Sequence, residues 1–208
     1  MVSVIAISPA AGGAAGRGLR SHGTAGGLGL PSYLRRATLV PMSDELEQRL
    51  VAAGDRLAGL GTALQQRGPW GLAERFDHSP EASWGPRETL AHLEEMLPFW
   101  LGEAERILEG AGEPVTFGRV ATDNVRLAII ERDRTLPLGE LLARVQAGVE
   151  RWRQRWAELD GPSRARRGTH VALGEMTVTD IATRFTVGHL EDHLDQLAAA
   201  LDGEPPRG

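Results

Sequence analysis

Apolar residues recur at intervals of three and four positions through most of the chain after residue 42, a spacing typical of helices that bury one face. The clearest example follows Ser43, which is a good N-cap residue, and stops at Gly68 and Pro69. Its apolar positions form a single stripe: Leu46, Leu50, Ala53, Leu57, Leu60 and Leu64. The pattern predicts a first amphipathic helix.

A second helix is predicted from Pro86 to about Glu109, because proline suits the first helical position and Gly110 follows the last apolar residues. Pro98 lies inside this span and cannot donate to the carbonyl of Glu94, so we expect a kink there. The stripe that this helix buries is expected to contain Leu90, Leu93, Met96, Leu97, Trp100, Ala104, Ile107 and Leu108.

The second half of the chain also shows apolar spacing typical of helices. Residues 123–132 fit a short helix, and residues 138–159 fit a long one that ends before a Gly-Pro pair. Residues 162–176 resemble a loop, and a last helix is expected from near Thr179 to about Leu201. No alternating strand pattern competes with these spans. Four long helices joined by glycine- and proline-containing turns predict an all-α protein, a four-helix bundle.

The first 41 residues differ from the rest, because they are rich in Gly and Ala and have no helical or strand period. We expect a disordered tail, or a start codon assigned too early with Met42 as the true first residue. A weak likeness to an organelle transit peptide is the alternative. Arg35 and Arg36 precede an acidic helix and no long apolar stretch, which argues against a secretory signal and favours a cytoplasmic protein. The expected domains are therefore 1–41 as tail, 42–203 as bundle and 204–208 as a disordered C-terminus.

The amino-acid composition excludes several catalytic mechanisms and disfavours some classes of partner. The chain has no cysteine, so a thiol can take part only as a substrate or cofactor, and it has no lysine, which excludes a Schiff-base mechanism through that residue. Residues 42–208 contain 19 arginines and 28 acidic residues, which disfavours nucleic acid and anionic membrane as partners. No apolar run approaches the roughly 20 residues that span a bilayer.

Two histidines in the last predicted helix form the strongest candidate site. His189 and His193 are one turn apart and lie in the middle of the apolar arc of a helical wheel, so both are expected to face the core. His92 falls just inside the apolar arc of the second helix. Buried imidazoles need partners, and a divalent metal ion would satisfy all three while leaving coordination positions open. Hydrogen-bonded core histidines are the alternative.

Three short segments resemble a known family. Residues 84–93 read Trp-Gly-Pro-Arg-Glu-Thr-Leu-Ala-His-Leu, residues 173–178 read Leu-Gly-Glu-Met-Thr-Val, and residues 189–197 read His-Leu-Glu-Asp-His-Leu-Asp-Gln-Leu. The first resembles the start of the second helix of the DinB/YfiT-like superfamily, and the others resemble its last loop and helix. The resemblance covers about residues 43–203. Pro98 departs from the family pattern.

The resemblance implies a four-helix bundle with up-down-down-up topology, often as a homodimer. It also implies that His92, His189 and His193 bind one divalent metal ion, usually zinc or nickel. Characterised relatives depend on low-molecular-weight thiols: mycothiol-dependent maleylpyruvate isomerase and bacillithiol S-transferases. A small-molecule thiol such as mycothiol and an electrophilic substrate are thus the expected partners, although many family members have no assigned activity.

The remaining candidates are weaker. His78 and His170 are expected in loops, as solvated residues. His170 precedes the last helix and could alternatively approach the site. Arg164, Arg166 and Arg167 could bind a substrate carboxylate, but a solvated run of charge is the simpler interpretation. Glu191 and Asp192 point away from the histidine pair on the wheel, so neither is assigned as a general base.

Three functions therefore remain in competition. The first is a metal-dependent enzyme that activates a thiol or water for S-transfer, isomerisation or hydrolysis. The second is a non-catalytic, stress-associated module that binds the same metal ion. The third is a purely structural helical bundle whose histidines are core residues.

Overall fold

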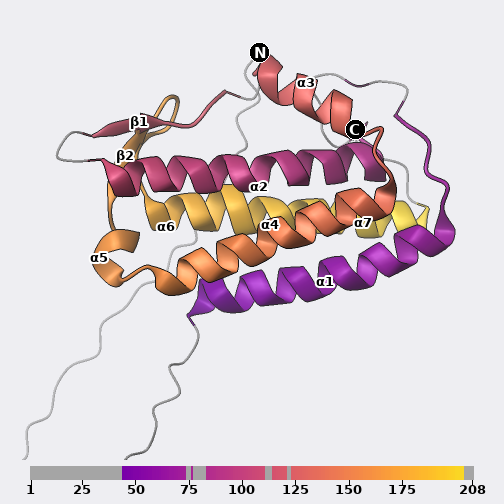
Figure 1. The fold of residues 1–208 in the computed structure, drawn as a ribbon, viewed down its shortest axis with the longest axis horizontal. Helices are drawn as coiled ribbons and strands as arrows, with labels where there is room; N and C mark the ends of the chain where they lie inside the picture. The colour runs from indigo at the N-terminus through magenta and orange to yellow at the C-terminus, as the bar shows by residue number, and fades with distance from the viewer. Residues whose placement is uncertain (1–43, 74–75, 77–82, 111–113, 121–122, 204–208) are drawn as a thin grey trace, which may run out of the picture. The chain divides into compact units, whose positions relative to one another are not determined.

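A computed structural model of the chain describes residues 44–73, 76, 83–110, 114–120 and 123–203. The described part is predominantly helical, and four long helical stretches pack together around one apolar core (Figure 1). Three are single helices: α1 (Glu45–Arg67), α2 (Pro86–Glu109) and α4 (Leu138–Glu158). The fourth is continuous but composite: α6 (Val178–Asp180), the π-helix η2 (Ile181–Gly188) and α7 (His189–Asp202). Two shorter helices, α3 (Asn124–Asp133) and α5 (Gly161–Arg164), complete the set.

The predicted helices agree with these bounds to within a residue or two. The predicted tail at 1–41 and C-terminus at 204–208 lie outside the described residues. Helix α1 contacts α4 and α7, and α2 contacts α4 and α7. Within the described residues, no helix is long and apolar enough to cross a membrane.

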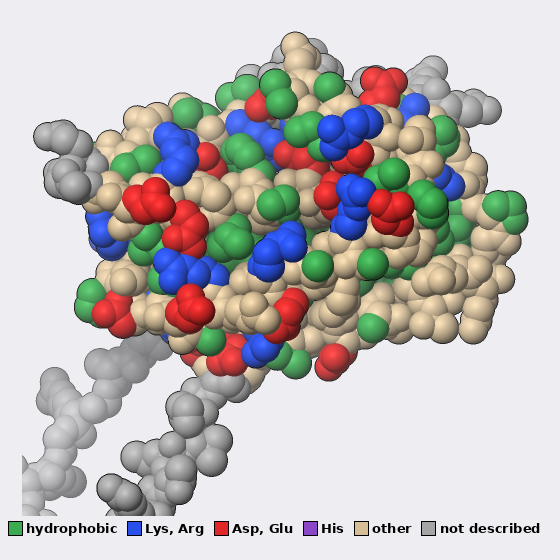
Figure 2. Space-filling model, viewed as in Figure 1, with side chains coloured by type: hydrophobic (Ala, Val, Ile, Leu, Met, Phe, Trp, Pro, Cys, Tyr) green, Lys and Arg blue, Asp and Glu red, His purple; other side chains and the backbone are tan. Residues whose placement is uncertain are grey.

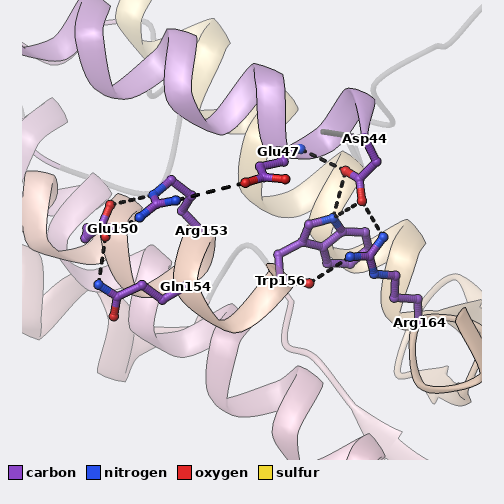
Figure 3. A network of polar contacts seen from close by, with 7 residues as sticks. All are labelled: Asp44, Glu47, Glu150, Arg153, Gln154, Trp156 and Arg164. Atoms are coloured by element: carbon purple, nitrogen blue, oxygen red, sulfur yellow. Dashed lines mark hydrogen bonds and ion pairs between the residues drawn. The ribbon is translucent and has the colours of Figure 1, made fainter. Parts of the chain in front are cut away.

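The start of α1 is fixed by a network of polar contacts (Figure 3). Asp44 is the N-cap and accepts from the backbone N–H of Glu47 at 3.0 Å, while the expected cap, Ser43, lies outside the described residues. The same carboxylate accepts from the Trp156 indole at 2.9 Å and from Arg164. Arg164 also donates to the Trp156 carbonyl at 2.9 Å, and its guanidinium lies 4.3 Å from the centre of the Trp156 ring. Arg164 thus joins α5 to the N-terminus of α1.

Helix α2 continues through Pro98, whose ring is exposed to solvent. On the buried side of the same turn, the Trp152 indole donates to the Leu97 carbonyl at 2.9 Å. Gly148 lets α4 approach at this point, because a Cβ atom there would lie 2.9 Å from Leu97 Cδ1. The kink expected at Pro98 stays a prediction.

The expectation of a bare loop and of no strands was wrong. A small sheet of order β1-β2-β3 is formed by β1 (Val115–Phe117), β2 (Arg167–His170) and β3 (Gly174–Thr177). Strand β2 pairs parallel with β1 and antiparallel with β3. Strands of three or four residues are too short to display a period of two in the sequence. Gly168 weakens the signal further, but only glycine fits there, since a Cβ atom would lie 2.8 Å from both Ile107 Cδ1 and the Val115 carbonyl.

Charged side chains of both signs are interspersed on the face shown in Figure 2. Within the described residues, charged side chains form ion pairs such as Arg49 with Glu191, Arg155 with Glu105 and Arg153 with Glu150. Exposed pairs of this kind each contribute little to stability, typically 0–1 kcal/mol. The packing of the apolar core therefore carries most of the stability of the fold.

Candidate metal centre

The structure brings together the three histidines that the sequence analysis selected. His92 comes from α2, and His189 and His193 come from the first turns of α7. His189 Nε2 lies 2.8 Å from His92 Nε2 and 3.1 Å from His193 Nε2. All the candidate ligand atoms lie within 4.8 Å of one another. Three imidazole nitrogens from two separate helices thus converge on one point.

Their spacing suits a shared metal ion. Two nitrogens bound tetrahedrally to zinc at about 2.0–2.1 Å are roughly 3.3 Å apart, close to the separations observed here. Hydrogen bonding alone is a poorer account of the cluster. An imidazole nitrogen offers either one N–H or one lone pair, so His189 Nε2 would have to share that one group between His92 and His193. The donor set therefore fits a divalent cation.

The orientation of His193 is fixed by a neighbouring amide. Gln196 Nε2 donates to the Trp84 carbonyl at 3.1 Å, so Gln196 Oε1 faces His193 Nδ1, 2.9 Å away, as an acceptor. His193 must then carry its proton on Nδ1, which leaves a lone pair on Nε2. This is the tautomer that a metal-binding Nε2 requires, and a hydrogen bond from the other ring nitrogen is the usual support for such a ligand.

Burial keeps all three imidazoles neutral. His92 and His193 are 2% and 5% exposed, whereas His189 is partly exposed. Burial lowers the pKa of His92 well below 6.5, and repulsion between a protonated His92 and any positive charge on His193, His189 or Arg119 acts in the same direction. Burial likewise lowers the pKa of His189 to about 3 and that of His193 to about 4, with the Gln196 hydrogen bond opposing the shift at His193. Neutral imidazole is the form that binds metal ions, so the cluster is ready for one at neutral pH.

Some polar atoms around the cluster have no partner within the described residues. They are His92 Nδ1, Thr89 Oγ1 and Thr186 Oγ1, and all three are buried. Each threonine precedes a cluster histidine by three residues, Thr89 on the helix of His92 and Thr186 just before His189. The support of His193 through Gln196 thus has no counterpart at His92 among the described side chains.

A π-helix leads directly into the cluster. Segment η2 ends at Gly188, immediately before His189. Glycine suits position 188 in this wider turn, because the Cβ atom of any other residue would lie 3.0 Å from the Thr183 carbonyl oxygen. Phe185 from the same segment stacks on Trp100 with ring centroids 4.3 Å apart. The sequence analysis assumed a regular α-helix here and missed this feature; π-helices are rare but often lie at functional sites.

Two arginines flank the histidines, and the sequence analysis singled out neither. Arg119 forms a two-pronged ion pair with Glu95, at 2.5 and 2.6 Å, and its guanidinium lies 3.8 Å from the centre of the Phe99 ring. Arg126 of α3 is 4% exposed, and its guanidinium lies 5.6 Å from the centre of the Trp84 ring. Both lie close enough to lower the pKa of His189. Nothing in the local sequence distinguishes them from surface arginines.

The prediction for His170 as a solvated loop residue was wrong. His170 is the last residue of β2 and is 6% exposed. Its ring stacks against Phe185, with centroids 5.3 Å apart, and contacts Phe117 and Trp100. It therefore packs within an aromatic cluster, and burial lowers its pKa.

The other sequence candidates lie away from the cluster or outside the described residues. Glu191 forms a two-pronged ion pair with Arg49 of α1, in agreement with its placement on the far side of the wheel. Arg166 donates to the Leu108 carbonyl at 2.7 Å, and Arg167 pairs with Glu175. His78 lies outside the described residues.

The surface cavities of the described part include one of about 330 Å³ and one of about 380 Å³. The first lies beside the Asp44 network and the second beside Trp70. A histidine lines neither of them.

Comparison with known proteins supports the interpretation of the fold and the cluster. The family model described as the DinB superfamily matches residues 41–197, which include all three histidines. A comparison with curated proteins finds no match.

Proposed function

Because the chain belongs to the DinB superfamily, we propose that it is a divalent-metal-dependent enzyme that activates a low-molecular-weight thiol or water for S-transfer, isomerisation or hydrolysis. His92, His189 and His193 hold the ion, which is zinc or nickel. The convergence of their three Nε2 atoms, 2.8 and 3.1 Å apart, is the observation that carries the proposal.

A bound divalent ion supplies Lewis acidity, which lowers the pKa of a coordinated thiol or water and makes it a nucleophile at neutral pH. The residues of the chain provide the conditions for that chemistry. Three neutral ligands leave both positive charges of the ion uncompensated, which favours an anionic fourth ligand such as thiolate or hydroxide. Gln196 holds the His193 ring in place, and the partly exposed His189 marks the side from which a substrate enters.

The absence of cysteine fits this scheme, because any thiol must come from outside the chain. The test is turnover by metal-loaded protein in a screen of small thiols against electrophilic acceptors. We expect a rate above that of the free metal ion, lost in His189→Ala. No rate above free metal with any pair would count against the enzyme.

A second candidate is a metal-binding module without turnover. The near-complete burial of His92 and His193 favours it. It predicts the same metal content as the enzyme and no reaction. A purely structural bundle, the third candidate, predicts no metal in either the wild-type protein or His189→Ala.

We also infer the up-down-down-up order of the family for α1, α2, α4 and the C-terminal helix. The contacts of α4 with both α1 and α2 support this order, as do those of α7 with the same two helices.

A further inference from the structure

One nitrogen of the His92 ring faces the cluster, and the other is buried without a hydrogen-bond partner among the described residues. His92 Nε2 lies 2.8 Å from His189 Nε2, whereas His92 Nδ1 is the unpartnered atom. An ion bound at Nε2 uses the lone pair of that nitrogen, so a neutral His92 must then carry its proton on Nδ1. A buried N–H group without an acceptor is costly. Metal binding by His92 therefore requires an acceptor near Nδ1.

Two more buried polar atoms on the preceding turn of α2 have no partner within the described residues. They are Glu88 Oε2 and Thr89 Oγ1, and both residues are 0% exposed. Residues three and four positions apart share a helical face, and a helical side chain leans toward the N-terminus of its helix. The His92 ring therefore lies over the turn that carries Glu88 and Thr89.

Contacts with the two residues that precede α2 place the ring and the carboxylate together. The His92 ring packs edge-on against Trp84, with ring centroids 5.6 Å apart. Glu88 Oε2 is directed at the next residue, since a Cβ atom at Gly85 would lie 3.2 Å from it. The ring and the free carboxylate oxygen thus both lie against residues 84 and 85, and the absence of a side chain at Gly85 leaves space beside that oxygen.

The other oxygen of Glu88 holds the carboxylate in position. Glu88 Oε1 accepts from the backbone N–H of Ala73 at 2.9 Å and from Arg134 at 3.1 Å. The Arg134 guanidinium lies 4.6 Å from the centre of the Phe76 ring, which fixes its own position. These contacts satisfy one carboxylate oxygen and leave the second as a strong acceptor, because hydrogen bonds to a carboxylate are charge-assisted.

We propose that Glu88 is a positioning residue for the metal centre. One water molecule accepts from His92 Nδ1–H and donates to Glu88 Oε2, with Thr89 Oγ1 as its third neighbour; three polar partners are typical of a buried water molecule. This link keeps the His92 proton on Nδ1 and the Nε2 lone pair directed at the ion, as Gln196 does for His193. The role of Glu88 rests on the proposed metal-dependent function and deepens it.

The experiment compares two buried glutamates of α2. Glu103 is the matched control, because it also accepts from a backbone N–H, that of Gly118, and from an arginine, Arg106. It lies about three turns further along α2 than His92. Zinc affinity is measured by competition with a chromophoric chelator for wild type, Glu88→Met and Glu103→Met. The proton positions on the His92 ring are read from the ¹⁵N chemical shifts of the zinc-free proteins, a readout that a merely structural role would not change.

In wild type we expect the His92 proton on Nδ1, and in Glu88→Met we expect it on Nε2. Zinc affinity should fall roughly ten- to a hundredfold in Glu88→Met, the range typical for loss of a supporting partner, and should match wild type in Glu103→Met. A folded Glu88→Met protein whose His92 proton stays on Nδ1 would overturn the proposal, and so would one that binds zinc as tightly as wild type.

A second variant covers the case in which Glu88→Met does not fold. That substitution leaves Arg134, whose side chain is 14% exposed, without its carboxylate, and a stranded buried charge is strongly destabilising. The double variant Glu88→Met/Arg134→Met removes both charges. It should show the same shift of the His92 proton and the same loss of zinc affinity, and it overturns the proposal if it shows only one of them or neither.

Failure of the metal site is distinguishable from failure of this inference. If wild type binds no zinc, the proposed function fails, but the proton positions in the zinc-free proteins still test Glu88. A His92 proton that moves from Nδ1 to Nε2 in the Glu88 variants supports the link between the two residues. The same proton position in wild type and variants overturns it.

Discussion

Removing the support of His193 is the change whose consequence follows most directly from the structure. In Gln196→Leu the acceptor at 2.9 Å from His193 Nδ1 is lost, together with the donor to the Trp84 carbonyl. The His193 ring can then rotate or change tautomer, and its Nε2 is no longer held toward His189. Loss of such a supporting hydrogen bond typically weakens metal binding by roughly ten- to a hundredfold.

That factor corresponds to about 1.4–2.7 kcal/mol of binding free energy. Gln196→Glu provides the contrast, because a carboxylate keeps the acceptor for Nδ1–H while it repels the Trp84 carbonyl. We therefore expect Gln196→Glu to lower the free energy of unfolding but to keep at least the wild-type affinity for the metal. Gln66→Leu, on the exposed face of α1, is the control for loss of a glutamine.

The assay is competition for zinc against a chromophoric chelator at neutral pH, with urea unfolding of the metal-free proteins measured in parallel. The two readouts separate support of a ligand from support of the fold. If Gln196→Leu binds zinc as tightly as Gln66→Leu, the tautomer argument for His193 is refuted.

Three further predictions test the energetics of the fold. Because the folded-state pKa values of His189 and His193 lie below 6.5, at about 3 and 4, the unfolded chain binds more protons below pH 6.5. The free energy of unfolding of the metal-free protein should fall by roughly 1.4 kcal/mol per pH unit for each such histidine as the pH falls from 6.5 toward 4. Equal urea midpoints at pH 7 and pH 5 would contradict this. Gly148→Ala should lower the free energy of unfolding by about 1–3 kcal/mol, because the new Cβ would lie 2.9 Å from Leu97 Cδ1. Gly102→Ala, with open space around it, should raise the free energy of unfolding by about 0.5–1 kcal/mol. Thermal unfolding of the two variants tests the difference. Asp44→Ala should lower the free energy of unfolding by about 1–2 kcal/mol through loss of the α1 cap and the Trp156 contact, and Asp44→Asn by less, because it keeps an acceptor; similar losses in both would contradict the capping argument.

The long helices were predictable because each combines a strong apolar period with a clear boundary residue. Pro86 and Gly110, for example, delimit α2 as the sequence analysis expected. The inward direction of His189 and His193 followed from the same periodicity, since both fall within the apolar arc of α7. That His92 meets them is a tertiary contact, which the wheel allowed and the family resemblance indicated.

The errors have physical causes of a different kind. His170 was placed in a solvated loop because the strands that bury it are three or four residues long and contain Gly168. The π-helix Ile181–Gly188 could not be recognised from the apolar periodicity. One widened stretch shifts the residues on a helical wheel by an angle smaller than the width of the apolar arc, so the same residues still fall on the apolar side. Arg126 was missed because its burial depends on how α3 packs against α2, which no local pattern encodes.

The most direct test of the central claim is the metal content of the full chain, purified without a histidine tag and measured by elemental analysis beside His189→Ala. The account predicts close to one equivalent of zinc or nickel in the wild-type protein and almost none in the variant. No metal in either protein, even after incubation with zinc and nickel, would contradict it and leave the three histidines as hydrogen-bonded core residues.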